Sequence, residues 1–458
     1  MSLAEIRGLG EKLRIDSKYF SKAAVTARQF IEAKPNERFE DVTTVMRKGI
    51  FDIKSDTYTE QGEGIPFVRI SDLKDGMIRE ASTAWISEDA HKAEFKTALE
   101  RRDIVLSKTA YPAAALVTVP ECNVSQDTIA IKLSALGRTK FDPEFIVAFL
   151  NSSLGMAILE AEFQGNVQEH LALSDARRLT IPKLSGTFQA AIRKLFEEAI
   201  SEKATATHLQ TQAEAELYSG LGLSGWTPPL PLSYSARATS VTEVGRIDAE
   251  YYAPRIRELI GILGRSGLTI GDIAPSRREK FDPSVHGSFS YIEIGNLPGD
   301  GTADSIVLDR SDAPSRATWH VHTGDVITST VRPIRRLSAL IEAYQDGDVC
   351  SSGFVVLQPT GVRSEVLLTY LRLPIFCELM DLHTSASMYP AISEKDLLGL
   401  PFAPPDPATE AAVCTAVANA RRARSQAAAL LNAAKRAVEI AIEEDEAAAL
   451  RFLDEQEA

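Results

Sequence analysis

Small groups of cationic, hydroxyl and amide residues stand at the ends of short apolar segments, and such groups occur in both halves of the chain. These side chains donate hydrogen bonds to phosphate oxygens, and Arg, Asn and Gln also form paired hydrogen bonds with base edges. The pattern therefore predicts contacts to double-stranded DNA. The candidate residues are Arg47, Lys48, Arg69, Ser107, Lys108, Thr109 and Gln168 in the first half, and Arg277, Lys280, Asn296, Ser329, Thr330, Arg332, Arg335 and Arg336 in the second.

Each of these residues taken singly also fits an ordinary solvated surface charge. Recurrence at equivalent places favours a DNA contact for residues 107–109 and 329–336.

Signatures of catalysis are absent from the sequence. It contains no GxxxxGK[ST] phosphate loop, no HExxH zinc helix and no GxSxG elbow. Asp89, Glu94 and Lys96 have the residue types of a metal-dependent nuclease, but the second half has no counterpart, and such triplets are common on solvated helices. We therefore expect a chain that is not an enzyme and holds neither a metal nor a cofactor of its own.

Length and composition indicate a multidomain protein of a reducing compartment. A chain of 458 residues predicts two to four domains. The net charge of −13, concentrated after Glu439, argues against a protein that coats nucleic acid, although local basic clusters decide individual contacts. Cys122, Cys350, Cys377 and Cys414 form no CxxC pair, which predicts buried thiols. Without a long apolar run or an apolar leader, we expect a cytoplasmic protein that contacts no membrane.

The chain also repeats itself. Segments of the first half recur in the same order in the second, which predicts two equivalent surfaces instead of one site. The matching segments are residues 14–20 with 246–252, 67–70 with 291–294, 103–107 with 325–329, and 181–182 with 400–401.

The elements that position the candidate residues follow from the apolar patterns. Short runs rich in Ile and Val predict strands near 65–70, 104–106, 114–119 and 128–133, and again near 290–294, 324–328 and 354–358. Residues 145–161 and 365–380 each predict one helix. After each globular part comes a long helix with apolar residues on alternating four- and three-residue steps, which predicts that the two helices pair as a coiled coil.

This organisation predicts an α+β protein with two similar mixed α/β domains, each followed by a long helix, the two helices pairing antiparallel. The expected boundaries are 1–185 for the first domain with its N-terminal segment, 186–218 for the first helix, 219–240 for a Gly/Pro linker, 241–404 for the second domain, and 405–458 for the second helix with an acidic tail.

The order of motifs resembles the specificity subunit of type I restriction-modification systems, over most of the chain. The resemblance depends on PFVRISDL at 66–73, RDIVLSKT at 102–109, the loop at 165–171, LTIPKL at 179–184, RIDAEYYAP at 246–254, and the long helix after each closure. No motif is specific alone; their order, repeated twice, carries the resemblance.

The resemblance implies that each globular part reads one half of a bipartite, asymmetric DNA site and that the helices set the spacing. Two methyltransferase subunits would dock on this chain and bring S-adenosylmethionine, and a restriction and translocation subunit would join them. Two alternatives stay open: a scaffold with duplicated protein-binding domains, and an enzyme with an unrecognised metal site.

Overall fold

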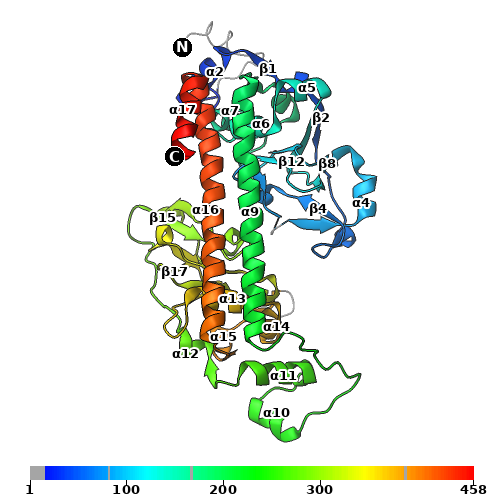
Figure 1. Ribbon diagram of the computed structural model, residues 1–458, viewed down its shortest axis with the longest axis vertical. Helices are drawn as coiled ribbons and strands as arrows, with labels where there is room; N and C mark the ends of the chain where they lie inside the picture. Colours follow the sequence, from blue (N-terminus) through cyan, green and yellow to red (C-terminus); the bar gives the residue numbers. More distant parts are fainter. Residues whose placement is uncertain (1–15, 81–82, 166–168, 386–388, 458) are drawn as a thin grey trace. The chain divides into compact units, whose positions relative to one another are not determined.

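The computed structural model describes residues 16–80, 83–165, 169–385 and 389–457, and the chain divides into two compact units (Figure 1). Unit 1 comprises Met1–Ala204 and Arg424–Ala458, and unit 2 comprises Thr205–Ala423. Two long helices, α9 (Gly186–Gly220) and α16 (Pro407–Glu443), each contribute one part to unit 1 and the other part to unit 2.

Unit 1 mixes helices and short strands. Its other helices are α2 (Lys22–Glu32), α3 (Phe39–Val42), α4 (Glu88–Ala93), α5 (Ala135–Lys140), α6 (Pro143–Leu150), α7 (Ser153–Glu162), α8 (Leu173–Arg178) and α17 (Glu446–Glu457). Its strands are β1 (Asn36–Arg38), β2 (Thr43–Lys48), β3 (Tyr58–Thr59), β4 (Ile65–Val68), β5 (Leu73–Lys74), β6 (Met77–Ile78), β7 (Ala84–Ile86), β8 (Leu99–Glu100), β9 (Ile104–Ser107), β10 (Ala114–Leu116), β11 (Glu121–Val124), β12 (Thr128–Leu133) and β13 (Thr180–Pro182). The sheets run in the orders β2-β12-β9-β10-β6-β5 and β3-β7-β4-β11-β8, and β1 pairs with β13.

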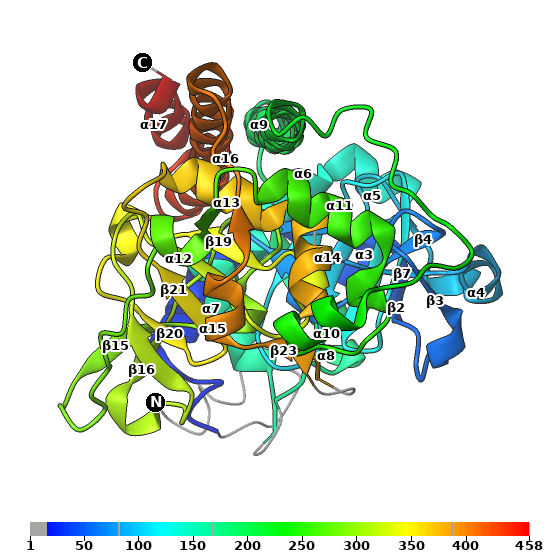
Figure 2. The same ribbon diagram turned by 90° about the horizontal axis from the view of Figure 1, so that it is seen from below.

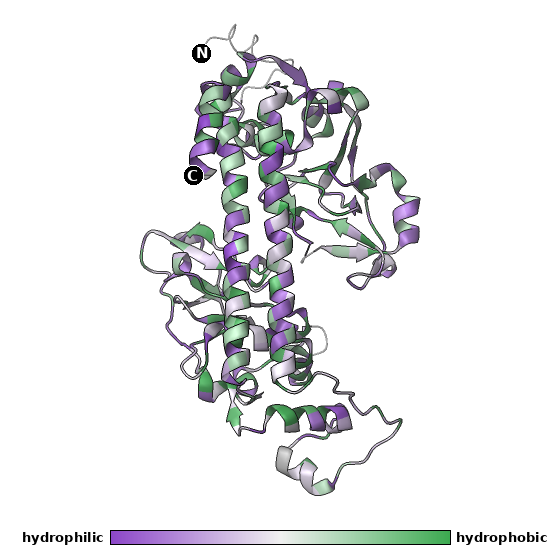
Figure 3. Cartoon of the chain, viewed as in Figure 1, coloured by the Kyte–Doolittle hydropathy of each residue, from purple (hydrophilic) through white to green (hydrophobic). Residues whose placement is uncertain are grey.

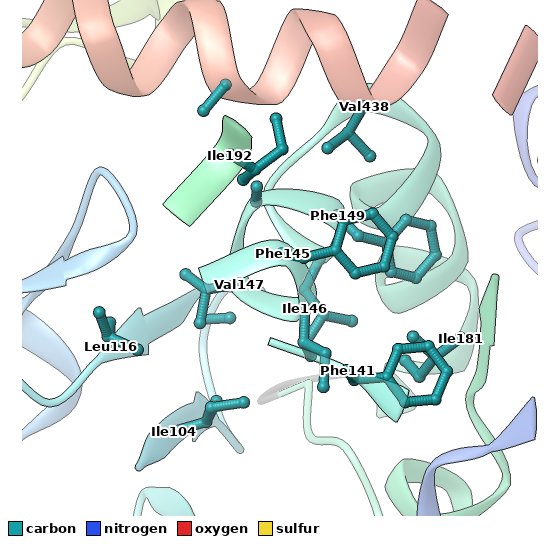
Figure 4. Packing of buried hydrophobic residues seen from close by; sticks show 14 of the residues in the cluster. Ile104, Leu116, Phe141, Phe145, Ile146, Val147, Phe149, Ile181, Ile192 and Val438 are labelled. Atoms are coloured by element: carbon teal, nitrogen blue, oxygen red, sulfur yellow. The ribbon is translucent and has the colours of Figure 1, made fainter. Parts of the chain in front are cut away.

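The core of unit 1 lies between its central strands and the long helices. Ile104 of β9 and Phe145 of α6 belong to the same buried cluster as Ile192 of α9 and Val438 of α16 (Figure 4). Burying a side chain of this size contributes roughly 1.5–3 kcal/mol. The globular part and the two helices of unit 1 therefore share one core.

Unit 2 has the same kinds of element. Its other helices are α10 (Ala238–Val244), α11 (Pro254–Leu263), α12 (Ile270–Ile273), α13 (Ser364–Arg372), α14 (Pro374–Leu382) and α15 (Glu394–Leu398). Its strands are β14 (Leu268–Thr269), β15 (Ser288–Ile292), β16 (Ile306–Asp309), β17 (Ala317–His320), β18 (Val326–Ser329), β19 (Ser338–Leu340), β20 (Val349–Ser351), β21 (Phe354–Leu357), β22 (Thr384–Ser385), β23 (Ala391–Ile392) and β24 (Pro401–Phe402). The sheets run β16-β15-β20-β17 and β19-β18-β21, with the pairs β14-β24 and β22-β23.

Strand pairing confirms the duplication. In unit 1, β9 lies antiparallel between β10 and β12, and in unit 2, β18 lies antiparallel between β19 and β21. A parallel pair accompanies each triplet, β4 with β11 and β15 with β20. An antiparallel pair also precedes each long helix, β1 with β13 and β14 with β24. The two globular parts thus share one mixed topology.

The long helices pair antiparallel within each unit, as predicted. In unit 1, Ile192 of α9 shares a buried cluster with Val438 of α16, and in unit 2, Ala206 of α9 shares one with Ala420 of α16 (Figures 1 and 2). The predicted apolar stripes are buried, with only Leu209 partly exposed: Phe188, Ile192, Leu195, Ala199, Ala206 and Ala213 on α9, and Val413, Val417, Ala420, Ala427, Leu431, Ala434, Val438 and Ala441 on α16. Hydrophilic and hydrophobic stretches alternate along both ribbons (Figure 3), as expected for helices that bury one stripe.

Two helices predicted as continuous are broken. Residues 145–161 fall on α6 and α7, which are bent by 71° at the break. The break comes at Asn151 and Ser152, where the Ser152 hydroxyl accepts a hydrogen bond from the Gly155 N–H as the cap of α7. Residues 365–380 fall on α13 and α14, because Pro374 has no N–H to continue the first helix.

The segment between the globular parts, predicted as a linker at 219–240, packs against unit 2 at its start. Leu221 and Leu223 are buried and Trp226 packs against the same cluster, whereas Leu230 is exposed. The acidic C-terminal residues form α17, whose Ala449 and Leu453 join the core of unit 1. Among the described residues no single helix is long and apolar enough to span a membrane, and the bent pair α6 and α7 meets that criterion only by length and composition.

Candidate nucleic-acid interface

Each unit carries a hairpin loop at the same place in its topology. The loop of unit 1 joins β9 to β10 (residues 108–113), and the longer loop of unit 2 joins β18 to β19 (residues 330–337). Most of the predicted contact residues lie on or beside these two loops.

The same backbone contacts hold the two loops. The N–H of Leu171 donates to the carbonyl of Lys108, and the N–H of Ile392 donates to the carbonyl of Thr330. The next residue of each loop forms a bridge to the same returning segment, Thr109 to His170 and Val331 to Ala391. Lys108 and Thr330 are therefore equivalent positions that differ in side chain.

The loop of unit 2 is held in a strained conformation. Arg332 and Arg336 have φ values of 51° and 60°, a region that non-glycine residues rarely occupy, and they flank the short helix η8 (Pro333–Arg335). The backbone N–H of Arg332 donates to Pro390, and its guanidinium lies 5.3 Å from the ring centre of Tyr389. This frame leaves Ile334 and Arg335 exposed.

Arg336 connects the same loop to the long helix. Its guanidinium donates to the carbonyl of Arg372 and to the carboxylate of Glu214 on α9. Arg372 is buried, donates to the carbonyls of Arg336 and Gly299, and has its pKa lowered to about 10 by burial. Arg336 thus positions the loop, and a contact of its side chain with DNA stays a prediction.

The loop of unit 1 presents different chemistry. Lys108 is half-buried, and Ala110 has a φ of 60°. The ring of Tyr111 is exposed, and its hydroxyl donates to the carbonyl of Ile70 at 3.1 Å. The equivalent loops therefore present different side chains, a lysine and a tyrosine in unit 1 and two arginines and an isoleucine in unit 2.

A buried aspartate stands before the central strand of each unit. Asp103 accepts a hydrogen bond from the N–H of Glu100, and Asp325 accepts one from the N–H of His322, both at 2.9 Å. Burial raises the pKa of Asp103 despite the nearby cations. Arg277 forms two hydrogen bonds to Asp325, which raise the pKa of the guanidinium. The side chain of Arg277 therefore neutralises a buried carboxylate, and a contact of this side chain with DNA stays a prediction.

Other predicted contacts also prove structural. Ser107 and Thr109 are buried, and the Ser107 hydroxyl accepts from the N–H of Ala113. Ser329 is buried and accepts from the N–H of Val331. The amide oxygen of Asn296 accepts from the N–H of Glu293 and caps η6 (Ile294–Asn296). Ser107, Ser329 and Asn296 therefore stabilise turns, and contacts of these three side chains and of Thr109 with DNA stay predictions.

The remaining predicted residues are at or near the surface. Arg69 is about half exposed and ion-paired with Asp72, which caps η2 (Ile70–Asp72). Thr330 donates to the carbonyl of Gly353, and Lys280 is exposed. Gln168 lies outside the described residues.

An open groove in unit 1 gathers cations that the sequence pattern did not bring together. Arg47 and Lys48 of β2 line it with Lys96, which precedes β8, and Arg177 of α8, and its volume is about 510 Å³. Glu94 is the acidic residue in its lining, which also includes Thr44, Met46, Thr97 and Leu173. Sequence reasoning missed Arg177, because nothing in the sequence around α8 indicates that it faces β2. It also missed the exposed Tyr111 and Ile334.

The comparisons with known proteins give structural likenesses only. No protein-family model and no curated protein matches the sequence. The chain is similar to the type I restriction-modification S subunit from M. genitalium, with 13% identity and a TM-score of 0.35 over 89% of this chain and 94% of that chain. It is similar to the HsdS subunit from Thermoanaerobacter tengcongensis, with 16% identity and a TM-score of 0.27 over 90% and 97%.

A third similar structure comes from a study of complex assembly and conformational transition in a type I restriction-modification system, with 17% identity and a TM-score of 0.29 over 90% of this chain and 98% of that chain. TM-scores below 0.5 assign no activity to this chain. All three solved structures come from type I restriction-modification systems.

Proposed function

We propose that this chain is the DNA sequence-recognition subunit of a type I restriction-modification complex or a related methylation-based defence complex. Each unit reads one half of a bipartite, asymmetric DNA site. The chain itself performs no catalysis and holds no cofactor; methyltransferase subunits, two per chain, dock on it and bring S-adenosylmethionine. A restriction and translocation subunit joins the complex where the system cleaves DNA.

The observation that carries this proposal is the pair of equivalent loops with different side chains. The two loops have the same backbone contacts, through Lys108 in unit 1 and Thr330 in unit 2. At their tips one presents Tyr111 and the other Ile334 and Arg335. A shared frame that presents different side chains suits the reading of two different short sequences, because the side chains at the base edges carry the specificity.

The long helices support the spacing role. α9 and α16 have 35 and 37 residues, which correspond to about 50–55 Å at 1.5 Å per residue. Half-sites one turn of DNA apart are separated by about 34 Å. Helices of this length, shared by both units, suffice to fix such a separation.

Methylation mapping of the assembled complex tests the proposal. Arg335→Ala should relax or change the bases required in one half of the modified site, at a cost of about 1–3 kcal/mol for the affected base pair. Lys108→Ala is the matched variant, and it should act on the other half only. Modification sites that both variants leave unchanged would overturn the reading role of the loops.

The alternative is a scaffold whose duplicated units bind protein. It predicts that the complex assembled with the wild-type chain binds DNA without sequence preference or not at all. Gel-shift measurements with a modified-site duplex and a random duplex of equal length separate the two functions.

A further inference from the structure

Each unit has a buried aspartate before its central strand, and different residues neutralise the two aspartates. In unit 2 the partner of Asp325 is Arg277, whose guanidinium Nε lies 2.8 Å from the carboxylate. In unit 1 the partners of Asp103 are Arg138, at 2.8 Å, and Lys132, at 3.5 Å. The arginine on β2 of unit 1 is therefore not needed to neutralise this carboxylate.

That arginine is Arg47, which occupies the position of Arg277. Arg47 pairs with Ala130 of β12, and the N–H of Arg277 donates to Val356 of β21, the equivalent strand. In the part of the chain that the structure describes, the next residue along the chain, Lys48 in unit 1 and Arg278 in unit 2, is also ion-paired only in unit 2. Arg278 is ion-paired with Glu394 at 2.8 Å, whereas the amine of Lys48 lies 4.8 Å from the ring centre of Phe51.

Arg47 and Lys48 contribute to the groove together with Lys96 and Arg177. All four side chains are exposed, and among the residues that the structure describes none of them has a carboxylate oxygen within 4.0 Å. With Glu94 the lining keeps a net positive charge in a chain whose total charge is −13. A concentration of unpaired cations in so acidic a protein favours a strongly anionic occupant.

We infer that this groove binds the phosphate backbone of double-stranded DNA, and that unit 1 supplies a sequence-independent grip that unit 2 lacks at the equivalent place. The inference rests on the proposed function and deepens it. Four cations on an open surface suit successive phosphates, which are regularly spaced along a strand. Contacts to phosphate fix the position of a protein on DNA and carry no base information. Unit 1 therefore holds the duplex while the two hairpin loops read it.

The test compares two full-length variants in complex with the chains that copurify with the wild type. One carries Arg47→Gln, Lys48→Gln, Lys96→Gln and Arg177→Gln. The other, the matched control, loses the same charge through Lys54→Gln, Lys92→Gln, Arg101→Gln and Lys183→Gln, exposed cations of unit 1 outside the groove lining. Binding is measured on a modified-site duplex and a random duplex of about 30 base pairs over a range of salt concentrations, and thermal unfolding checks that both variants fold.

Each phosphate contact contributes about 0.9 to the slope of log K against log salt concentration. For the groove variant, the magnitude of this slope should fall by about 3 to 4. Its affinity for both duplexes should decrease by the same factor, so that the ratio of the two affinities is preserved. The control should keep most of the slope. Arg278→Gln, at the position of Lys48 in unit 2, should also keep it.

The outcomes separate this inference from the proposed function. A wild-type complex that binds no DNA or does not discriminate the two duplexes overturns the proposed function. Discrimination together with an unchanged slope in the groove variant overturns only the inference. Loss of a copurifying chain from the groove variant with unchanged DNA binding would assign the groove to an acidic protein partner and overturn it as well.

Discussion

Whether an arginine near the surface contacts a ligand or supports the fold depends on the carboxylates that the fold places beside it. Arg47 and Arg277 occupy equivalent positions in the two units. Arg277 is held by the buried Asp325, whereas Arg47 lines an open groove. The difference arises because Arg138 and Lys132 neutralise Asp103 in unit 1, so that Arg47 is not needed there.

This difference predicts that the same substitution lowers stability strongly at one position and hardly at the other. Arg277→Ala leaves the carboxylate of Asp325 buried without its cation and should lower the free energy of unfolding by about 2–3 kcal/mol. Arg47→Ala removes an exposed side chain and should change it by less than about 0.5 kcal/mol. Denaturant unfolding of the two variants measures both values. Equal values for the two variants would mean that Asp325 is not neutralised by Arg277 in solution.

A histidine in unit 2 predicts a pH dependence of stability. The side chain of His322 lies 3.0 Å from Glu279 and 3.3 Å from Asp346, and the hydrogen bond to Glu279 raises its pKa above 6.5. The pKa of Glu279 is lowered mainly by the same hydrogen bond, and that of Asp346 mainly by the Thr323 N–H.

The sign follows from linkage. Because the folded pKa of His322 is raised, its stabilisation is fully present below its unfolded pKa and is lost as the pH rises through the folded pKa. The carboxylates contribute the opposite dependence, lost as the pH falls through their depressed pKa values. His322→Gln should therefore lose stability relative to wild type at about pH 5.5, by at most about 1 kcal/mol, and less at about pH 8.5. A difference that grows with pH would contradict the assignment.

At the scale of elements, local sequence signals set the boundaries, including two helix breaks that the apolar pattern did not predict. β12 was predicted at 128–133 and is found there. The apolar run at 145–161 has a helical period throughout, yet α6 and α7 are separate helices, since Ser152 caps the second. Pro374 was a visible signal for the break between α13 and α14, and the apolar pattern on both sides outweighed it in the prediction.

Caps recur between the units as the strands do. The carboxylate of Asp72 accepts from the N–H of Arg69 at 2.9 Å, and the amide of Asn296 accepts from the N–H of Glu293 at the same distance. Aspartate and asparagine are both good acceptors for such a cap. A polar residue after a strand can therefore stabilise the turn itself, so the position of Asn296 after a strand does not by itself indicate a DNA contact.

At the scale of the whole molecule, two units share two helices. α9 and α16 each pass from one unit to the other, between Ala204 and Thr205 and between Ala423 and Arg424. Both stretches of each helix bury an apolar stripe in the core of their own unit. Under the proposed function, the length of the helices is thus the variable that sets the gap between half-sites.

This predicts the effect of lengthening both helices. Seven residues added at each of these two points keep the apolar stripes in phase to within about 20°. The assembled complex should then modify sites with a different number of unspecified base pairs between unchanged half-sites, which methylation mapping measures. Insertion into α9 alone should put the stripes out of step and lower the melting temperature. An unchanged gap with both insertions in place would refute the spacing role.

The sequence by itself determined the duplication, the antiparallel helix pair and most of the strands. Each of these features produces residue types that recur at a fixed period or in a fixed order, such as the apolar stripe from Val413 to Ala441. Such a stripe can be recognised from the residues of one helix alone.

Only the tertiary structure decided which polar residues are available for contact. In sequence, Ser107, Arg277 and Arg336 are candidate contacts as much as Arg47 and Arg335 are. In the structure, Ser107 accepts from a backbone N–H, Arg277 donates to Asp325 and Arg336 donates to Glu214, each within its own unit. Hydrogen bonds and ion pairs join residues far apart in the chain, and their presence depends on ångström-scale placement that residue type and spacing do not encode.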